Sequence, residues 1–138
     1  MIHKLDNWPV AFAAALSHAE NKPFIWGEND CCLFACNCIL AITGVDLART
    51  FRGYATAPQA AALIAGYGGL YQLVSAVCRD HAMPEISPRM ARRGDPVLFE
   101  GGEGLTLGIC TGDKIAAPGR KGLSTYGILK GLYAWRIE

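Results

Sequence analysis

The sequence carries almost no net charge, because 13 Lys and Arg side chains are set against 12 Asp and Glu side chains among 138 residues. Binding a polyanion needs an excess of positive charge, so nucleic acid and anionic membrane surfaces are poor candidates for partners. The longest apolar run is too short to span a bilayer, and residues 1–5 lack the apolar core of a signal peptide. These absences predict a protein that is made in the cytosol and has no membrane span.

Internal repeats, low-complexity stretches and linkers are also missing, which favours a single domain over residues 1–138. A chain of this length buries roughly two-thirds of the surface that its unfolded form exposes. One hydrophobic core is therefore expected. The glycines at 101–104 are not followed by a lysine or a helix, so they predict a hairpin turn and not a phosphate-binding loop.

Six cysteines stand at positions 31, 32, 36, 38, 78 and 110. Without a secretion signal, free thiols are the default. Cys32 and Cys36 lie four positions apart on one face of a predicted helix, and Cys78 or Cys110 could complete a zinc or iron–sulfur site with them. The paired Cys-x-x-Cys motifs of such sites are absent, so core packing is favoured, and no metal or other cofactor is predicted.

Hydrophobic periodicity predicts helices in the first half of the chain and strands in the second. The predicted helices cover residues 6–21, 31–43, 57–65 and 70–82, and the Ser87–Pro88 step can start a short helical turn. The predicted strands cover residues 96–100, 105–111, 114–117, 122–129 and 132–137. This order indicates an α+β fold, and the 31–43 helix, apolar on nearly every side, is expected at its centre on an antiparallel sheet.

Cys31 opens the first turn of that central helix, after Asp30, which is placed to cap it, and Gly44 is placed to end it. Unpaired amides at a helix N-terminus favour the thiolate and can lower a cysteine pKa from about 8.5 to about 3.5–7.5. Enzymes activate a nucleophilic cysteine by lowering its pKa in this way. Cysteine is also a common small core residue, so spacing alone leaves both interpretations open.

Three patches carry a resemblance to a known family: residues 24–27 (Phe-Ile-Trp-Gly) followed by Asp30-Cys31, residues 93–99 (Arg-Gly-Asp-Pro-Val-Leu-Phe), and residues 107–112 with 116–118. In this order and spacing they resemble the NlpC-type papain-like cysteine peptidases, which cleave peptide stems of bacterial cell walls and also occur as phage tail proteins. The resemblance covers nearly the whole chain. It implies a papain-like fold with the cysteine-bearing helix packed on a C-terminal antiparallel sheet.

The resemblance also implies a site, with Cys31 at the nucleophile position and Trp26, Asp30 and Thr106 around it. Thr106 stands where the family has the histidine that takes the cysteine's proton. Ala116 stands where a polar residue orients that histidine, and residue 24, often a tyrosine in the family, is a phenylalanine. A threonine hydroxyl cannot act as a general base near neutral pH, and alanine has no group to donate or accept. Losing one member of a cooperating catalytic set can lower turnover about a millionfold.

The missing base predicts a catalytically degenerate domain, and the resemblance to small NlpC-like proteins encoded among phage tail genes implies a structural protein of a phage tail, at the tail tip or hub. Such a protein would be assembled in the host cytoplasm with other tail proteins as partners. His3, His18 and His81 are expected to be surface or capping residues. Exposed aromatic side chains would anchor the contacts; the candidates are Trp8, Tyr67, Tyr126, Tyr133 and Trp135. Trp26 and Trp135 could equally be core residues. The alternative is a cysteine hydrolase that opens peptidoglycan peptides during DNA entry, using Cys31 and a base that the sequence does not identify. A neighbouring subunit is one source of that base, and His18 or His81 is another.

Overall fold

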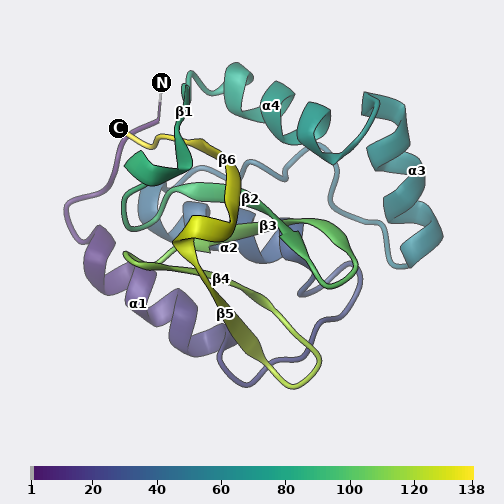
Figure 1. The fold of residues 1–138 in the computed structure, drawn as a ribbon, viewed down its shortest axis with the longest axis horizontal. Helices are drawn as coiled ribbons and strands as arrows, with labels where there is room; N and C mark the ends of the chain where they lie inside the picture. Colours follow the sequence, from purple (N-terminus) through teal and green to yellow (C-terminus); the bar gives the residue numbers. More distant parts are fainter. Residues whose placement is uncertain (1) are drawn as a thin grey trace.

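The computed structural model describes residues 2–138, and it has the α+β architecture that the sequence predicts (Figure 1). Four helices come first: α1 (Trp8–Ala19), α2 (Cys31–Thr43), α3 (Ala57–Tyr67) and α4 (Leu70–Asp80). Six strands follow: β1 (Glu85–Ile86), β2 (Pro96–Gly101), β3 (Gly104–Cys110), β4 (Lys114–Pro118), β5 (Leu123–Gly127) and β6 (Gly131–Trp135). Two 3₁₀ turns, η1 (Pro88–Met90) and η2 (Ile128–Lys130), flank the strands.

The bounds of the predicted elements agree with the observed ones to within two residues, and the helical turn predicted after Ser87 is η1. One strand was not predicted. β1 has only two residues, too few to show an alternating pattern. It exists because Glu85 and Ile86 pair with Trp135 and Ala134 of β6, a contact between distant segments that no local pattern announces.

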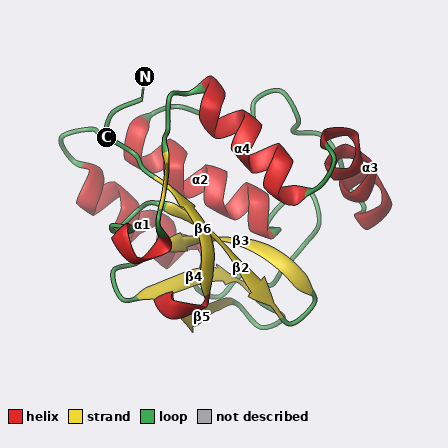
Figure 2. Ribbon diagram, turned by 45° about the horizontal axis from the view of Figure 1, so that its top comes forward, coloured by secondary structure: helices red, strands yellow, loops and turns green. Residues whose placement is uncertain are grey.

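The strands form one antiparallel sheet in the order β1-β6-β2-β3-β4-β5. Helices α1, α2 and α4 lie on one side of it (Figure 2). The main core forms between these helices and the sheet, and its fully buried members include Phe34, Ile39 and Ile42 of α2 with Leu98 and Ile109 of the sheet. As the all-round apolar sequence predicted, α2 occupies the centre of the domain.

A second, smaller cluster fills the opposite face of the sheet, made of Val97, Phe99, Cys110, Ile115, Ala117 and Ala134. Partly buried side chains of β1, η2 and their neighbours pack against it, including Ile86, Ala91 and Ile128. Both faces of the sheet are therefore apolar, and position along a strand decides which cluster a side chain joins.

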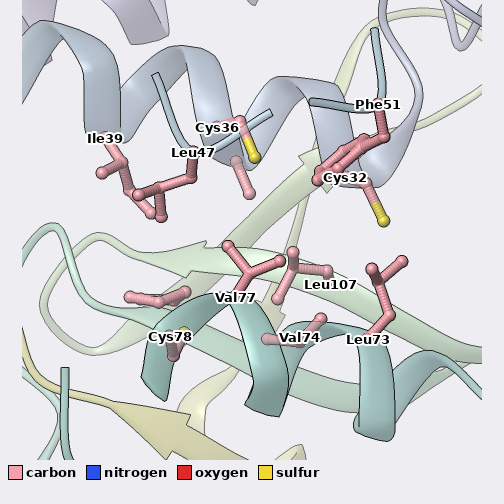
Figure 3. A pocket seen from close by; sticks show the side chains of 12 residues that line it. Cys32, Cys36, Ile39, Leu47, Phe51, Leu73, Val74, Val77, Cys78 and Leu107 are labelled. Carbon is pink, nitrogen blue, oxygen red and sulfur yellow. The ribbon is translucent and has the colours of Figure 1, made fainter. Parts of the chain in front are cut away.

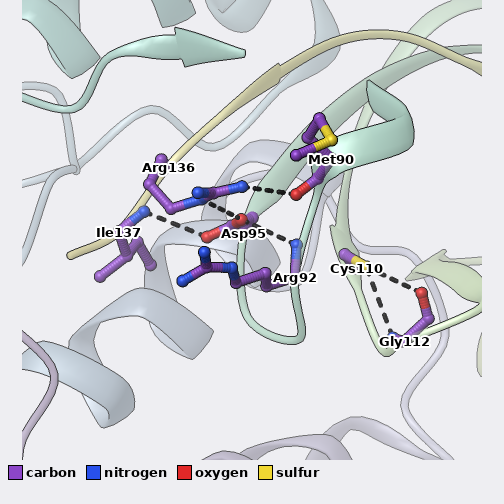
Figure 4. Close-up of polar contacts among 7 residues, drawn as sticks. All are labelled: Met90, Arg92, Asp95, Cys110, Gly112, Arg136 and Ile137. Atoms are coloured by element: carbon purple, nitrogen blue, oxygen red, sulfur yellow. Dashed lines mark hydrogen bonds and ion pairs between the residues drawn. The ribbon is translucent and has the colours of Figure 1, made fainter. Parts of the chain in front are cut away.

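The chain between β6 and the C-terminus is fastened by one buried carboxylate, that of Asp95 just before β2 (Figure 4). Its Oδ2 accepts hydrogen bonds from the Arg92 N–H at 2.9 Å and from the Arg136 Nε at 3.3 Å, and its Oδ1 accepts one from the Ile137 N–H at 3.1 Å. Arg136 also donates to the Met90 carbonyl. Segments about 40 residues apart in sequence thereby share one set of polar contacts.

The aromatic side chains proposed as docking anchors fall into two groups. Of the two interpretations left open for Trp135, anchor or core, the structure shows the core one: the side chain is only 2% exposed, because β6 turns that indole inward towards the helices. Trp8 and Tyr126 are partly buried. Tyr67 and Tyr133 are exposed, by 44% and 37%.

Among the described residues, no single helix has both the length and the apolar composition needed to cross a membrane. Taken together, α3 and α4 pass that test on length and composition, but the two helices are bent by 68° relative to each other.

Candidate functional site

Cys31 lies at the N-terminus of α2, beside a cavity of about 110 Å³. Its walls come from four parts of the chain: the start of α2, the loops on either side of that helix, the α3–α4 pair, and β3. The lining residues are Trp26, Asp30, Cys31, Cys32, Phe51, Tyr54, Ala60, Leu63, Ile64, Leu70, Leu73 and Leu105. Cys31 as a whole residue is partly exposed, and it is one of the residues that line this cavity.

Asp30 organises the polar side of this cavity. It is almost completely buried, with 1% of its surface exposed. Its Oδ1 caps α2 by accepting the Leu33 N–H at 3.0 Å, as the sequence predicted. Its Oδ2 accepts the Gly27 N–H at 3.0 Å and the Tyr54 hydroxyl at 2.6 Å.

Gly27 allows this arrangement because of its backbone conformation. Its φ is +79°, a left-handed value that side chains disfavour, and a Cβ there would lie 2.3 Å from the Tyr54 carbonyl oxygen. The Trp26-Gly27 step therefore turns the chain tightly towards Asp30 and lets the loop before α3 lie directly against it.

The Cys31 thiol is the one thiol among the six whose environment favours the thiolate. Hydrogen bonding from the Cys32 thiol lowers the pKa of Cys31, and the backbone N–H groups of Leu107 and Cys32 act in the same direction. Burial and the negative charge of Asp30 oppose this effect. As the donor in the pair, Cys32 has its pKa raised, and burial adds to that rise.

The other four thiols are buried, and burial raises the pKa of each. For Cys36 and Cys38 the pKa rises to about 12. They are neutral core groups near pH 7. All six cysteines are free, and within residues 2–138 no three His, Cys, Asp or Glu side chains are grouped closely enough to hold a metal ion.

Thr106 does not line the cavity beside Cys31. In the β2–β3 ladder it pairs with Phe99, and directly paired residues of antiparallel strands point to the same side of the sheet. Phe99 belongs to the cluster on the face away from α2. The Thr106 hydroxyl donates to the Gly104 carbonyl at 3.0 Å, within its own hairpin. The side chain that β3 contributes to the cavity is Leu105.

Of the other residues assigned to the site, Trp26 and Asp30 line the cavity with Cys31, whereas Ala116 does not. Ala116 is fully buried in the main core opposite Ile109, and its methyl group offers no hydrogen bond. Phe24 packs edge-on against Trp26, with ring centroids 4.8 Å apart. A tyrosine hydroxyl does reach this region, but Tyr54 supplies it.

None of the three histidines lines the cavity. The His81 Nδ1 lies 3.0 Å from the Val77 carbonyl oxygen at the end of α4, and the His18 Nε2 lies 2.8 Å from the Lys22 Nζ. His3 is exposed near the N-terminus. The capping and surface positions predicted for these side chains agree with their places in the structure.

Residues 3–137 match the model of a domain of unknown function, DUF6950, which is nearly the whole chain. The chain belongs to the DUF6950 family. No curated protein matches its sequence. In this DUF6950 domain, the Cys31 thiol with its lowered pKa and the buried Asp30–Tyr54 contact lie at the same cavity.

Several residues of the DUF6950 site could not be found by sequence reasoning, notably Tyr54, Phe51, Leu63 and Leu105. They come from a loop, a helix and a strand that only the tertiary fold brings together. Tyr54 sits in a segment without periodicity, so no local signal marked it. The alternation of β3 could have placed Leu105 and not Thr106 opposite α2, once Phe99 was known to face the other way.

We expect Cys31 of this DUF6950 domain to react fastest of the six thiols with iodoacetamide near pH 7, because its pKa is lowered and the pKa values of the others are raised. Replacing Cys32 by Ala removes the donor that stabilises the thiolate, so the pH profile of Cys31 alkylation should move to higher pH. Peptide mapping by mass spectrometry after timed alkylation measures both effects. Cys38→Ala, a change at a buried thiol on the same helix, should leave the profile in place. Equal alkylation rates at Cys31 and Cys38 in the native protein would contradict this expectation.

Proposed function

We propose that this chain is a catalytically degenerate NlpC-like domain of papain-like fold, serving as a structural protein of a phage tail at its tip or hub. The observation that carries the loss of catalysis is the composition of the cavity beside Cys31. Its walls include no imidazole within residues 2–138, and β3 contributes the side chain of Leu105. A thiolate alone can attack a carbonyl, but expelling an amine and activating water both need a proton carrier.

The papain-like fold is supported by the arrangement of elements. A cysteine at the first turn of a central helix packs on an antiparallel sheet, and the helix precedes the sheet in the chain. Asp30 supports the same proposal, since its carboxylate fixes the turn that presents Cys31. The assignment to a phage tail rests on resemblance: the Trp-Gly-x-x-Asp-Cys-Cys start at residues 26–32, together with Thr106 in place of the strand histidine, resembles small NlpC-like proteins encoded among phage tail genes. A fold can persist in evolution after the catalytic activity of its ancestor is lost.

A second candidate function is a cysteine hydrolase that acts on peptidoglycan peptides. The lowered pKa of Cys31 favours it, because an activated thiolate is the first requirement of such an enzyme. A base would then have to be supplied by another subunit.

Incubation of the purified protein with soluble muropeptides distinguishes the two functions. We expect no release of peptide fragments above the level given by Cys31→Ala, as followed by chromatography and mass spectrometry. Cleavage that requires Cys31 would refute the degenerate assignment. The tail assignment is tested separately by mixing the protein with purified tails that lack it. Stoichiometric incorporation supports the proposal, and no binding to any tail component contradicts it.

A further inference from the structure

The cavity beside Cys31 is lined almost entirely by hydrocarbon. Leu63, Ile64 and Leu70 come from the α3–α4 pair, and Leu105 comes from β3. The Tyr54 hydroxyl donates to the Asp30 carboxylate, which also accepts two backbone N–H groups, so these two polar side chains already have partners. A peptide stem buried here would leave its amides without partners, at a cost of about 1–3 kcal/mol for each group. An aliphatic chain has no such groups to satisfy.

A second, fully apolar cavity of about 30 Å³ lies between α2 and α4, and it shares Cys32, Phe51 and Leu73 with the first as walls. Figure 3 shows Cys32 and Cys36 projecting from α2 towards the α4 side chains that face them. One water-sized group needs about 10–15 Å³. The outer cavity therefore has room for several carbon atoms, with further apolar space behind its shared walls.

We propose that this cavity is an acyl-binding site, in which Cys31 accepts a short aliphatic acyl group from a thioester and retains it. The Cys31 sulfur attacks the thioester carbonyl carbon and forms a new carbon–sulfur bond. The bond from that carbon to the donor sulfur breaks, and the donor leaves as a thiolate that takes a proton from water. The thiolate form of the attacking group carries out thioester exchange, and the lowered pKa of Cys31 favours that form, so the proton can be lost to solvent without a general base in the cavity.

Retention of the acyl group follows from the same geometry. This step rests on the proposed function, because it requires that the domain has lost its hydrolytic base. Hydrolysis of the Cys31 thioester needs a base to activate water, and no histidine of residues 2–138 lines the cavity. The aliphatic walls also exclude water from the acyl chain. The expected product is therefore a single stable adduct and not a released acid.

The experiment treats the full chain with acetyl and hexanoyl thioesters of N-acetylcysteamine and follows intact mass with time. Burying one methylene changes affinity by roughly a factor of four, and the two donors differ by four methylenes. We expect the hexanoyl group to add at least tenfold faster than the acetyl group, once per chain, at Cys31 by peptide mapping. The adduct should persist for hours and be removed by hydroxylamine. Cys31→Ser should give no hydroxylamine-sensitive adduct.

Two variants distinguish the contribution of the cavity wall to the acylation rate from that of the thiol. Leu63→Asp places a charge in the cavity wall and should lower the hexanoyl rate at least tenfold, whereas Ala62→Asp, at an exposed position of the same helix, should not change it. The rate of Cys31 alkylation by iodoacetamide checks that both variants keep the fold around the thiol.

Equal rates for hexanoyl and acetyl donors, or an unchanged hexanoyl rate in Leu63→Asp with Cys31 still alkylated, would overturn the acyl-site proposal and leave the proposed function standing. Release of more than one equivalent of hexanoic acid in a Cys31-dependent reaction would overturn both the retention of the acyl group and the loss of hydrolytic turnover.

Discussion

Replacing Asp95 by Ala should lower the free energy of unfolding by about 3–5 kcal/mol, the range found when one partner of a buried ion pair is removed. The carboxylate has no exposed surface, and the Arg136 side chain that it pairs with is 14% exposed. The substitution leaves this guanidinium and the N–H groups of Arg92 and Ile137 without their acceptor. A domain of this size has about 5–15 kcal/mol of stability in total, so the loss is a large fraction.

Thermal and urea denaturation followed by circular dichroism measure this effect, and the melting temperature should fall by roughly 10–20 °C. Asp113→Ala is the matched control, since Asp113 is exposed in the turn between β3 and β4. That variant should stay within about 0.5 kcal/mol of the native protein. If Asp95→Ala were equally mild, the buried contacts of this carboxylate would not be what fastens the C-terminal segment.

Replacing Asp30 by Ala should lower the free energy of unfolding by about 3–5 kcal/mol. Three donors lose their acceptor at once: the Leu33 N–H, the Gly27 N–H and the Tyr54 hydroxyl. Losing a helix cap alone costs typically about 1 kcal/mol, and each buried donor left unpaired costs about 1–3 kcal/mol. Loss of the Asp30 acceptor should also release the segment around Tyr54 from α2.

Thr56→Ala provides the comparison for Asp30→Ala under urea denaturation. Thr56 caps α3 and accepts the Gln59 N–H, but this cap is exposed to solvent. Its loss should cost about 1 kcal/mol. Equal losses for the two variants would show that Asp30 acts as an ordinary cap and that its contacts with Gly27 and Tyr54 contribute nothing to stability.

Local sequence signals located the main elements because each is specified by neighbouring residues. α2 illustrates this, with a capping carboxylate at Asp30, an all-round apolar run, and Gly44 in a left-handed conformation at its end. The strands of the second half were found in the same way, through short apolar runs separated by glycine-containing turns. β1 was not found, and the sequence left Trp135 open between surface and core, because both depend on pairing and packing between distant segments.

By itself, the sequence determined the α+β order, the central cysteine-bearing helix and the position of Cys31 in its first turn, since helix caps and hydrophobic periodicity act over a few residues. Only the tertiary structure decided what surrounds that thiol. It brought Tyr54 onto Asp30, placed Leu105 in the cavity, and turned Thr106 to the other face of the sheet. The physical reason is that a strand's alternation fixes two faces, and the packing of the whole domain chooses which face meets α2.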